Sequence, residues 1–412
     1  MHLLFASLLL LTTQVRPSLA YTSLSDTSLR HLTLQTPPFT SSSSPDPDID
    51  PDFDPVHGTL LSPILHPRVP GTPGHARVQE HFASFIRTHL HPGWTVEWHN
   101  TTATTPATGD MQVPFQNLIL RRDPPWVSGS GSSSRDRDRQ DSRGSSQGGG
   151  GEGEGEVARL TLAAHYDSLY RPEGFVGAVD SAVPCAVLLF VARAVDEALT
   201  RRWEGMGEGG GLEEEKGVQI LFLDGEEAWV EWSEGDSLYG SRALAESWEA
   251  ARYESGSSFS TPLEAISLFV LLDLLGAPEP NIPSYFPSTH WAYQNLAKVE
   301  ERLRKLGLLE TKPRKPFLAE SEKKEVRYRG FVQDDHVPFM RRGVDILHII
   351  PTPFPPVWHT MDDDGAHLDV PTIRDWAKMV TAFVAEWMDL EGHFLETGTG
   401  EAGSAYSEKE EL

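Results

Sequence analysis

Two adjacent carboxylates, Glu226 and Glu227, are the residues of this sequence best placed to carry out chemistry. They follow the apolar run at residues 218–223 and a short Asp224-Gly turn. A glutamate pair is in general solvated surface charge, but a position directly after an apolar, β-prone run favours a functional site. If Glu227 binds a metal ion, Glu226 can lie beside that ion without binding it and transfer protons. A partly desolvated cleft would raise the pKa of Glu226 toward the working pH.

Polar side chains also follow the other apolar, β-prone runs of the sequence. The four runs are residues 160–164, 218–223, 266–272 and 346–350. The groups that follow them are His165 and Asp167, the Glu226-Glu227 pair, Asp273, and, after a proline-rich loop, His359. Because open α/β sheets bind ligands at the carboxyl ends of their strands, we expect these groups at one edge. His165 and Asp167 could serve a purely structural role, and the other histidines, including His348, are interpreted as core or surface groups.

Asp180, Glu227 and His359 are interpreted as the ligands of a single zinc ion. Zinc accepts carboxylate oxygen and imidazole nitrogen in a tetrahedron, and catalytic sites supply three protein ligands and keep one position open. A cluster of thiolate ligands and an intramolecular disulfide are both excluded, because Cys185 is the only cysteine. Cys185 lies in an apolar run, which favours a buried hydrophobic side chain over a nucleophile.

The elements that must position these groups can be predicted from the remaining pattern. Helical periodicity predicts helices at residues 181–199, 290–306 and 371–390, the first with Asp180 or Ser181 as its N-cap. Strands that alternate with helices are typical of an α/β domain, in which a mostly parallel sheet has helices on both faces.

Charge restricts the range of partners. The 412 residues include 60 acidic and 35 basic side chains, a formal net charge of −25. Binding to nucleic acid requires a basic face, so we expect none. The same charge argues against docking on an anionic membrane. No heptads and no large apolar stripe suggest self-association, so we expect a monomer.

The N-terminal run Met1-His-Leu-Leu-Phe-Ala-Ser-Leu-Leu-Leu-Leu-Thr is too short to span a bilayer and ends near Ser18-Leu19-Ala20. This pattern predicts a cleaved signal peptide at residues 1–20, and therefore a protein that is secreted or stays in the secretory pathway without a membrane anchor. The sequon Asn100-Thr101-Thr102 is consistent with that route and predicts a glycoprotein.

Composition divides the rest of the sequence. A segment rich in Pro, Ser and Asp predicts disorder at residues 21–56, and the catalytic domain is expected at residues 57–392. A low-complexity insertion at residues 127–156 interrupts this domain as a surface loop, and a polar tail occupies residues 393–412.

Ordered motifs then identify a family. They are His165-Tyr-Asp-Ser, Phe175-Val-Gly-Ala-Val-Asp-Ser-Ala-Val-Pro-Cys, Phe222-Leu-Asp-Gly-Glu-Glu-Ala, Asp236-Ser-Leu-Tyr-Gly-Ser-Arg, Leu272-Asp-Leu-Leu-Gly-Ala-Pro, Gln333-Asp-Asp-His-Val-Pro-Phe and Ile350-Pro-Thr-Pro-Phe-Pro-Pro-Val-Trp-His-Thr-Met-Asp-Asp. With these motifs the sequence resembles the glutaminyl-peptide cyclotransferases, secreted relatives of the zinc aminopeptidases, over about residues 57–392. The family converts the N-terminal glutamine of peptides to pyroglutamate with loss of ammonia.

The resemblance implies a role for each matching residue. It implies a single domain with a mixed, mostly parallel sheet, one zinc per chain and Glu226 as general acid/base. Asp273 and Asp334 would complete a catalytic hydrogen-bond network. The substrate pocket would be lined by Trp232, Gln333, Phe354 and Trp358. The implied substrates are peptides or proteins with N-terminal glutamine.

The sequence departs from the family at one place. By the resemblance to its animal members, a cysteine would precede the His-Tyr-Asp-Ser motif and pair with the cysteine of Val-Pro-Cys. Ala164 occupies that position here, so Cys185 is unpaired and stability depends on packing alone.

Counting ligands leaves a second enzyme class open. A two-zinc aminopeptidase, which removes N-terminal residues, would bind its second zinc through His165 and Asp273, with Asp180 as the bridge and Glu226 activating water. The Gln333-Asp-Asp-His segment and the proline-rich loop before His359 favour the cyclotransferase. A catalytically inactive binding module is disfavoured because no ligand or acid/base position is lost.

Overall fold

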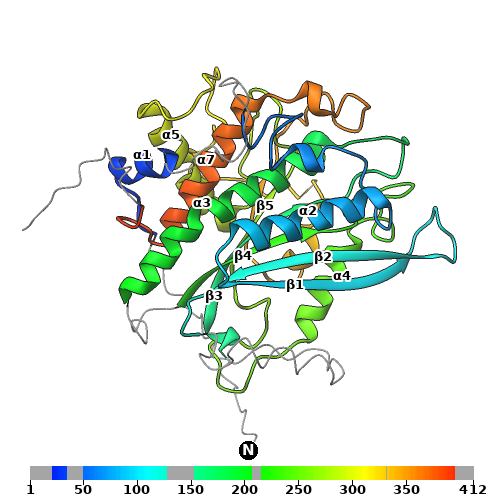
Figure 1. The fold of residues 1–412 in the computed structure, drawn as a ribbon, viewed down its shortest axis with the longest axis horizontal. Coiled ribbons are helices and arrows are strands. Elements are labelled where there is room, and N and C mark those ends of the chain that lie inside the picture. Colours follow the sequence, from blue (N-terminus) through cyan, green and yellow to red (C-terminus); the bar gives the residue numbers. More distant parts are fainter. Residues whose placement is uncertain (1–20, 35–49, 128–152, 207–214, 331, 395–412) are drawn as a thin grey trace, which may run out of the picture.

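The structure is a computed structural model that describes residues 21–34, 50–127, 153–206, 215–330 and 332–394 (Figure 1). At its centre lies a six-stranded sheet in the order β1-β2-β4-β3-β5-β6. The strands are β1 (Trp94–Thr104), β2 (Gln112–Arg122), β3 (Val157–His165), β4 (Glu215–Leu223), β5 (Ile266–Leu272) and β6 (Ile346–Ile349). β1 and β2 form an antiparallel edge, whereas β4, β3, β5 and β6 are parallel. The predicted mixed, mostly parallel sheet is therefore confirmed.

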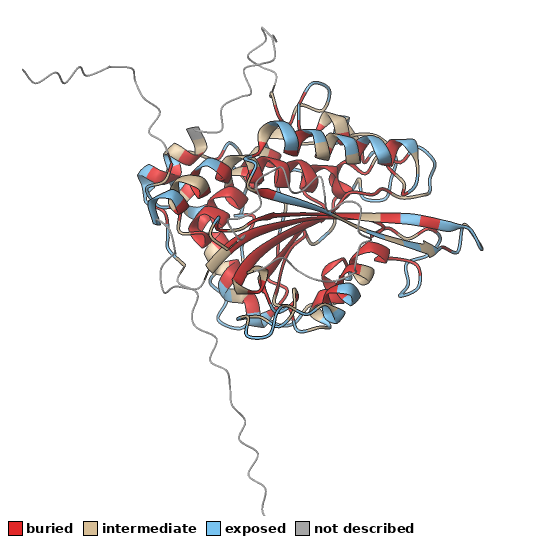
Figure 2. Cartoon of the chain, turned by 60° about the horizontal axis from the view of Figure 1, so that its bottom comes forward, coloured by how far each residue is buried: buried red, intermediate tan, exposed pale blue. Residues whose placement is uncertain are grey.

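Helices cover both faces of the sheet, as Figure 2 shows. One face carries α1 (Asp26–Leu34), α2 (Pro73–His89), α3 (Val183–Met206), α5 (His290–Lys305) and α7 (Val370–Trp387), whose apolar side chains belong to one buried cluster. The other face carries α4 (Tyr239–Ala250) and α6 (His336–Met340). Successive strand residues alternate between these faces: Leu162 and Ala164 pack with the first layer and Ala163 with the second. Both faces are buried, which explains the continuous apolar runs in the sequence.

The register of the parallel strands determines where their polar ends lie. Ala164 pairs with Phe222, His165 with Leu223, and Leu272 with Ile349. β3, β4, β5 and β6 therefore end at nearly the same level, so the residues that follow them meet at one edge of the sheet, as predicted.

The three predicted helices correspond to α3, α5 and α7, but the predicted N-cap of α3 is wrong. A π-helical turn, Ala178–Ala182, precedes this helix, and Asp180 and Ser181 have non-helical dihedral angles within it. Their side chains instead contact His165 and Asp273. α3 is apolar enough to cross a membrane by length and composition, yet 89% of its apolar window is buried. Its apolar character is accounted for by this position in the core.

The prediction of disorder at residues 21–56 is wrong for the described parts. α1 buries Leu29 and Leu32, and the N–H of Leu24 donates to Glu386 of α7 over 2.9 Å. Asp52 forms an ion pair with Arg193 of α3 at 2.6 Å. A few apolar residues at helical spacing are enough to dock a short segment, a signal that composition averaged over the segment conceals.

The folded domain therefore extends on the N-terminal side of the predicted boundary at residue 57. The predicted signal peptide, residues 35–49, most of the insertion at 127–156 and most of the tail at 393–412 lie outside the described residues.

Candidate metal centre

Four segments that are far apart in sequence meet at the carboxyl edge of the sheet. β3 ends at His165, β4 leads into the turn with Glu226 and Glu227, and β5 leads into Asp273. The loop after β6 returns to the same edge with His359, whose φ of 56° is left-handed. The expectation that these groups cluster is confirmed.

The three predicted zinc ligands lie together. His359 Nε2 is 3.3 Å from Asp180 Oδ2 and 3.7 Å from Glu227 Oε2. One ligand atom from each of the three residues lies within 4.8 Å of the others. Asp180 and Glu227 are buried, whereas the His359 side chain is 35% exposed.

The chemistry of this group fits a divalent cation. Glu227 Oε1 is buried and has no hydrogen-bond partner among the described residues. Burial raises the pKa of Glu227 well above its ordinary value, and the carboxylate of Asp180 raises it further. Such a cluster lacks positive charge, and two carboxylates with one imidazole are a donor set that zinc accepts.

A second group overlaps the first. His165 Nε2 lies 3.0 Å from Asp180 Oδ1 and 3.6 Å from Asp273 Oδ1, and ligand atoms of these three residues lie within 4.8 Å of one another. Asp180 thus directs one carboxylate oxygen to His165 and the other to His359. The ligands that a two-zinc site would need are therefore close together as well.

Glu226 lies beside the metal group but outside it. Its side chain is buried, and burial raises its pKa well above the ordinary value, helped by the carboxylates of Asp334 and Glu227. A buried carboxyl with a raised pKa can hold and release a proton during a reaction, which suits the predicted general acid/base.

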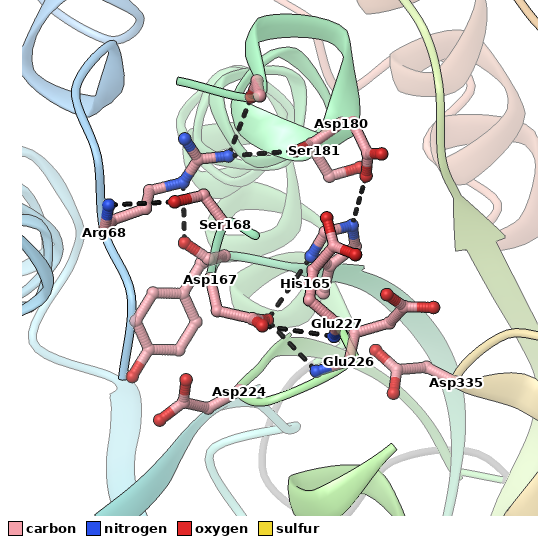
Figure 3. Close-up of polar contacts among 12 residues, drawn as sticks. Arg68, His165, Asp167, Ser168, Asp180, Ser181, Asp224, Glu226, Glu227 and Asp335 are labelled. Atoms are coloured by element: carbon pink, nitrogen blue, oxygen red, sulfur yellow. Dashed lines mark hydrogen bonds and ion pairs between the residues drawn. The ribbon is translucent and has the colours of Figure 1, made fainter. Parts of the chain in front are cut away.

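Asp167 positions the glutamate pair. Its two carboxylate oxygens accept hydrogen bonds from the backbone N–H groups of Glu226 and Glu227, at 3.1 and 3.2 Å (Figure 3). Its Oδ1 also lies 3.4 Å from His165 Nδ1. The sequence left open whether Asp167 has a purely structural role, and these contacts support that role.

Arg68 is a positioning residue that the sequence did not reveal. Its side chain is fully buried, and its guanidinium donates to the carbonyl oxygens of Tyr166 at 2.7 Å and Gly177 at 2.8 Å (Figure 3). The same group donates to the carbonyl of Asp180 at 3.3 Å. It therefore ties the loop after β3 to the turn that carries Asp180, and nothing in the local sequence of Arg68 indicates this contact.

Asp334 is held by a histidine to which the sequence analysis assigned no role. His348 Nε2 and Asp334 Oδ2 are 2.7 Å apart, and both side chains are buried. Burial alone would raise the pKa of Asp334, but the hydrogen bond with His348 holds it below its ordinary value. Asp334 is absent from the cavity wall, whereas Asp273 lines it. Only the pairing of β5 with β6 brings His348 beneath the site.

A cavity of about 1030 Å³ opens over these groups. All four predicted pocket residues line it: Trp232, Gln333, Phe354 and Trp358. Glu226 and the three predicted ligands line the same cavity. The Trp358 ring stacks on His359 with centroids 3.9 Å apart, and Phe354 meets Trp358 edge-on at 4.8 Å. Trp229 and Val230 line the cavity too and were not predicted.

Comparisons with known proteins cover the same region. The family model "Peptidase family M28" matches residues 150–384. The chain is 39% identical over 335 residues to a glutaminyl-peptide cyclotransferase-like protein of Bos taurus, covering 81% of this chain and 75% of that protein. It is 36% identical over 334 residues to the glutaminyl-peptide cyclotransferase of Bos taurus, covering 80% and 81%.

Solved structures agree in fold. The glutaminyl cyclase of Macrostomum lignano superposes with a TM-score of 0.66 at 29% identity, over 90% of this chain and 96% of that one. A leucine aminopeptidase precursor of Bacteroides thetaiotaomicron superposes with a TM-score of 0.51 at 19% identity, over 81% and 97%. The likeness to the aminopeptidase precursor concerns the fold alone. The reaction therefore has to be inferred from the residues of the site.

Proposed function

This chain belongs to the glutaminyl-peptide cyclotransferase family within peptidase family M28, and we propose that it is itself a zinc-dependent glutaminyl-peptide cyclotransferase. The observation that carries the proposal is the buried carboxyl of Glu226 beside Asp180, Glu227 and His359, on the wall of one cavity. Identity of 36–39% to cyclotransferase-family proteins over four-fifths of the chain supports the same reaction.

The reaction joins two groups of one residue. The α-amine of an N-terminal glutamine attacks the amide carbon of its own side chain, and the new C–N bond closes the ring. The bond from that carbon to the original amide nitrogen breaks, which releases ammonia. Bound by Asp180, Glu227 and His359, a zinc ion would supply Lewis acidity at the amide oxygen. The protein mainly has to hold the side chain folded back toward its amine.

Glu226 would move the protons. Its carboxylate accepts one from the attacking amine and returns one to the departing nitrogen, so protons balance over the cycle. Asp273 lines the same cavity and would bind the amine. Asp334, held by His348, would support this network from behind the wall.

The aromatic side chains would exclude water from the reacting carbonyl. Trp232 and Trp358 are 37% and 38% exposed, and both line the mouth of the cavity with Phe354. A bound glutamine side chain would cover the faces of these rings and displace water from them. Water would then be unable to compete with the amine as the nucleophile.

Ammonia release tests the proposal. We expect a Gln-initiated peptide to yield ammonia and pyroglutamyl peptide, and a Leu-initiated peptide to remain uncut. A chelator should stop the reaction, and added zinc should restore it. Release of free leucine would refute the proposal.

The alternative function is that of a two-zinc aminopeptidase. The observation that favours it is the second group of His165, Asp180 and Asp273, whose ligand atoms lie within 4.8 Å of one another. Two zinc ions per chain together with leucine release would establish this alternative.

We further propose that the protein acts as a monomer in the secretory pathway on peptides or proteins with N-terminal glutamine. Asn100 of the sequon lies exposed on the edge strand β1, where a glycan would have room. A shift in mass on treatment with a glycosidase that removes N-linked glycans would support this route.

A further inference from the structure

One basic side chain, Arg171, stands at the wall of the cavity. The other charged residues of the described wall, His359 aside, are acidic: Asp180, Glu226, Glu227 and Asp273. Arg171 belongs to the loop between β3 and α3, which also carries Phe175, whose ring meets His359 edge-on at 6.3 Å. The loop therefore lies beside the metal group, with the guanidinium at its outer side, 61% exposed.

The guanidinium is held there by an aromatic stack. Its central carbon lies 4.8 Å from the centroid of the Tyr170 ring. Tyr170 in turn stacks on Trp229, with centroids 4.8 Å apart and an interplanar angle of 28°. Trp229 is 7% exposed and forms part of the cavity wall. A cation over an aromatic face is attracted by the electrons of the ring, so this stack favours a position of the guanidinium at the mouth of the cavity.

The ion pair formed by Arg171 leaves it able to bind another carboxylate. Its partner Glu173 is 92% exposed, at 3.7 Å, which is too long for a hydrogen bond. An exposed pair of this kind contributes little. The planar guanidinium has five N–H donors and can bind a carboxylate through two of them.

We propose that Arg171 selects peptides with an acidic side chain shortly after the N-terminal glutamine. The inference rests on the proposed function. With the first residue at Glu226 on the cavity floor, the rest of the peptide must leave through the mouth, where each extended residue advances roughly 3.5 Å. A carboxylate at position two, three or four then meets the one basic group of the described wall, whereas a lysine there meets repulsion.

Peptides of the form Gln-Ala-Xaa-Ala-amide test this selection, with Glu, Gln or Lys as Xaa and matched series that move the charge to position two or four. At low salt we expect kcat/KM to favour Glu over Lys by about fivefold at one of these positions, the size of an exposed charge pair. The difference should lie in KM, because Arg171 would contact a later residue of the peptide and not the glutamine that reacts. It should shrink in 0.5 M NaCl as screening increases.

Charge reversal provides the decisive comparison. Arg171→Glu should invert the preference to Lys, and Arg171→Gln should reduce it to near one. Arg87→Gln is the matched control: Arg87 on α2 is 62% exposed, pairs with Glu80 and does not line the cavity. This control should keep the wild-type preference.

The two proposals fail in different ways. If neutral Gln-peptides release ammonia but Arg171→Glu still prefers Glu, or Arg87→Gln alters the preference equally, the role of Arg171 is refuted while the proposed function stands. If no Gln-peptide of any charge releases ammonia, the proposed function is refuted and the selection by Arg171 with it.

Discussion

Ser181 donates a hydrogen bond of 2.5 Å from its hydroxyl to Oδ1 of Asp273. The same oxygen accepts the backbone N–H of Leu274 at 2.8 Å. An oxygen with two such donors has little capacity left for a metal ion, so Asp273 could offer one only its other carboxylate oxygen. This contact therefore distinguishes Asp273 from Glu227, whose Oε1 has no partner among the described residues.

We expect one zinc per chain as a consequence. Elemental analysis after dialysis against excess zinc should give a ratio near one, and Asp273→Asn should retain that ratio. His359→Ala should lose most of the metal, because it removes one of three ligands. A ratio of two that falls to one in Asp273→Asn would show that Asp273 is a ligand.

The adjacent glutamates should separate into two phenotypes. Glu226→Gln should keep its zinc and lose turnover by a factor of about 10²–10⁴, the usual contribution of a general acid/base. Glu227→Gln should lose metal affinity together with turnover. Zinc content and kcat measured on the same samples test this division, and loss of metal from Glu226→Gln would contradict it.

Asp236 should stabilise the wall of the cavity in a pH-dependent way. Its carboxylate accepts the N–H groups of Trp229, Val230 and Glu231 at 2.9, 2.8 and 3.0 Å, and the hydroxyl of Tyr239 at 2.8 Å. A hydrogen bond to an ionised group contributes about 1.5–3 kcal/mol, so we expect Asp236→Asn to lose roughly 2 kcal/mol of unfolding free energy. The exposed Asp110→Asn is the control and should lose almost nothing.

The pH dependence has a definite sign. Burial alone would raise the pKa of Asp236, but the hydrogen bonds from the backbone N–H groups lower it below the ordinary 3.8. A carboxyl whose pKa is lower in the folded state stabilises the fold above its unfolded pKa. The gap between wild type and Asp236→Asn should thus be full at pH 7 and shrink as the pH falls below 3.8. Urea unfolding of both proteins at pH 7 and below pH 3.8 checks this. A difference in unfolding free energy that stays constant with pH would be inconsistent with an ionised acceptor.

Cys185 should be inert in the folded protein. Burial raises the pKa of its thiol to about 12, and its Sγ lies 3.1 Å from the carbonyl oxygen of His165. We expect no reaction with a thiol reagent at pH 8 until the protein is unfolded in denaturant. Rapid labelling of the native protein would contradict the buried position.

The same sulfur contacts the backbone of His165, the residue after Ala164, and Ala164 and Cys185 are both buried in the same apolar cluster. Ala164→Cys should therefore form a disulfide with Cys185 under oxidising conditions and raise the free energy of unfolding by about 3 kcal/mol, as expected for a loop of roughly 20 residues. The same variant kept reduced serves as the control. An oxidised variant no more stable than the reduced one would show that the site is strained or out of reach.

The sequence by itself determined the four parallel strands of the sheet and the polar residues that gather at their carboxyl ends. Apolar runs near 160, 218, 266 and 346 are buried on both faces, so their pattern alone identifies parallel strands. Parallel strands end at one edge, which is why His165, Glu227 and Asp273 could be placed together before any contact was known. The short helix α1 was missed because its apolar residues, Leu29 and Leu32, become significant only against α7.

Tertiary structure alone decided which side chains support these residues. The partners are distant in sequence: Arg68 reaches the carbonyl of Asp180 across 112 positions, and Ser181 reaches Asp273 across 92. No periodicity encodes such a contact, because a hydrogen bond depends on the position and direction of two groups in space. The sequence revealed the acidic residues of the cavity because they follow parallel strands. It could not reveal the place of Arg171 at the mouth, because that depends on the stacking of Arg171 on Tyr170 and of Tyr170 on Trp229.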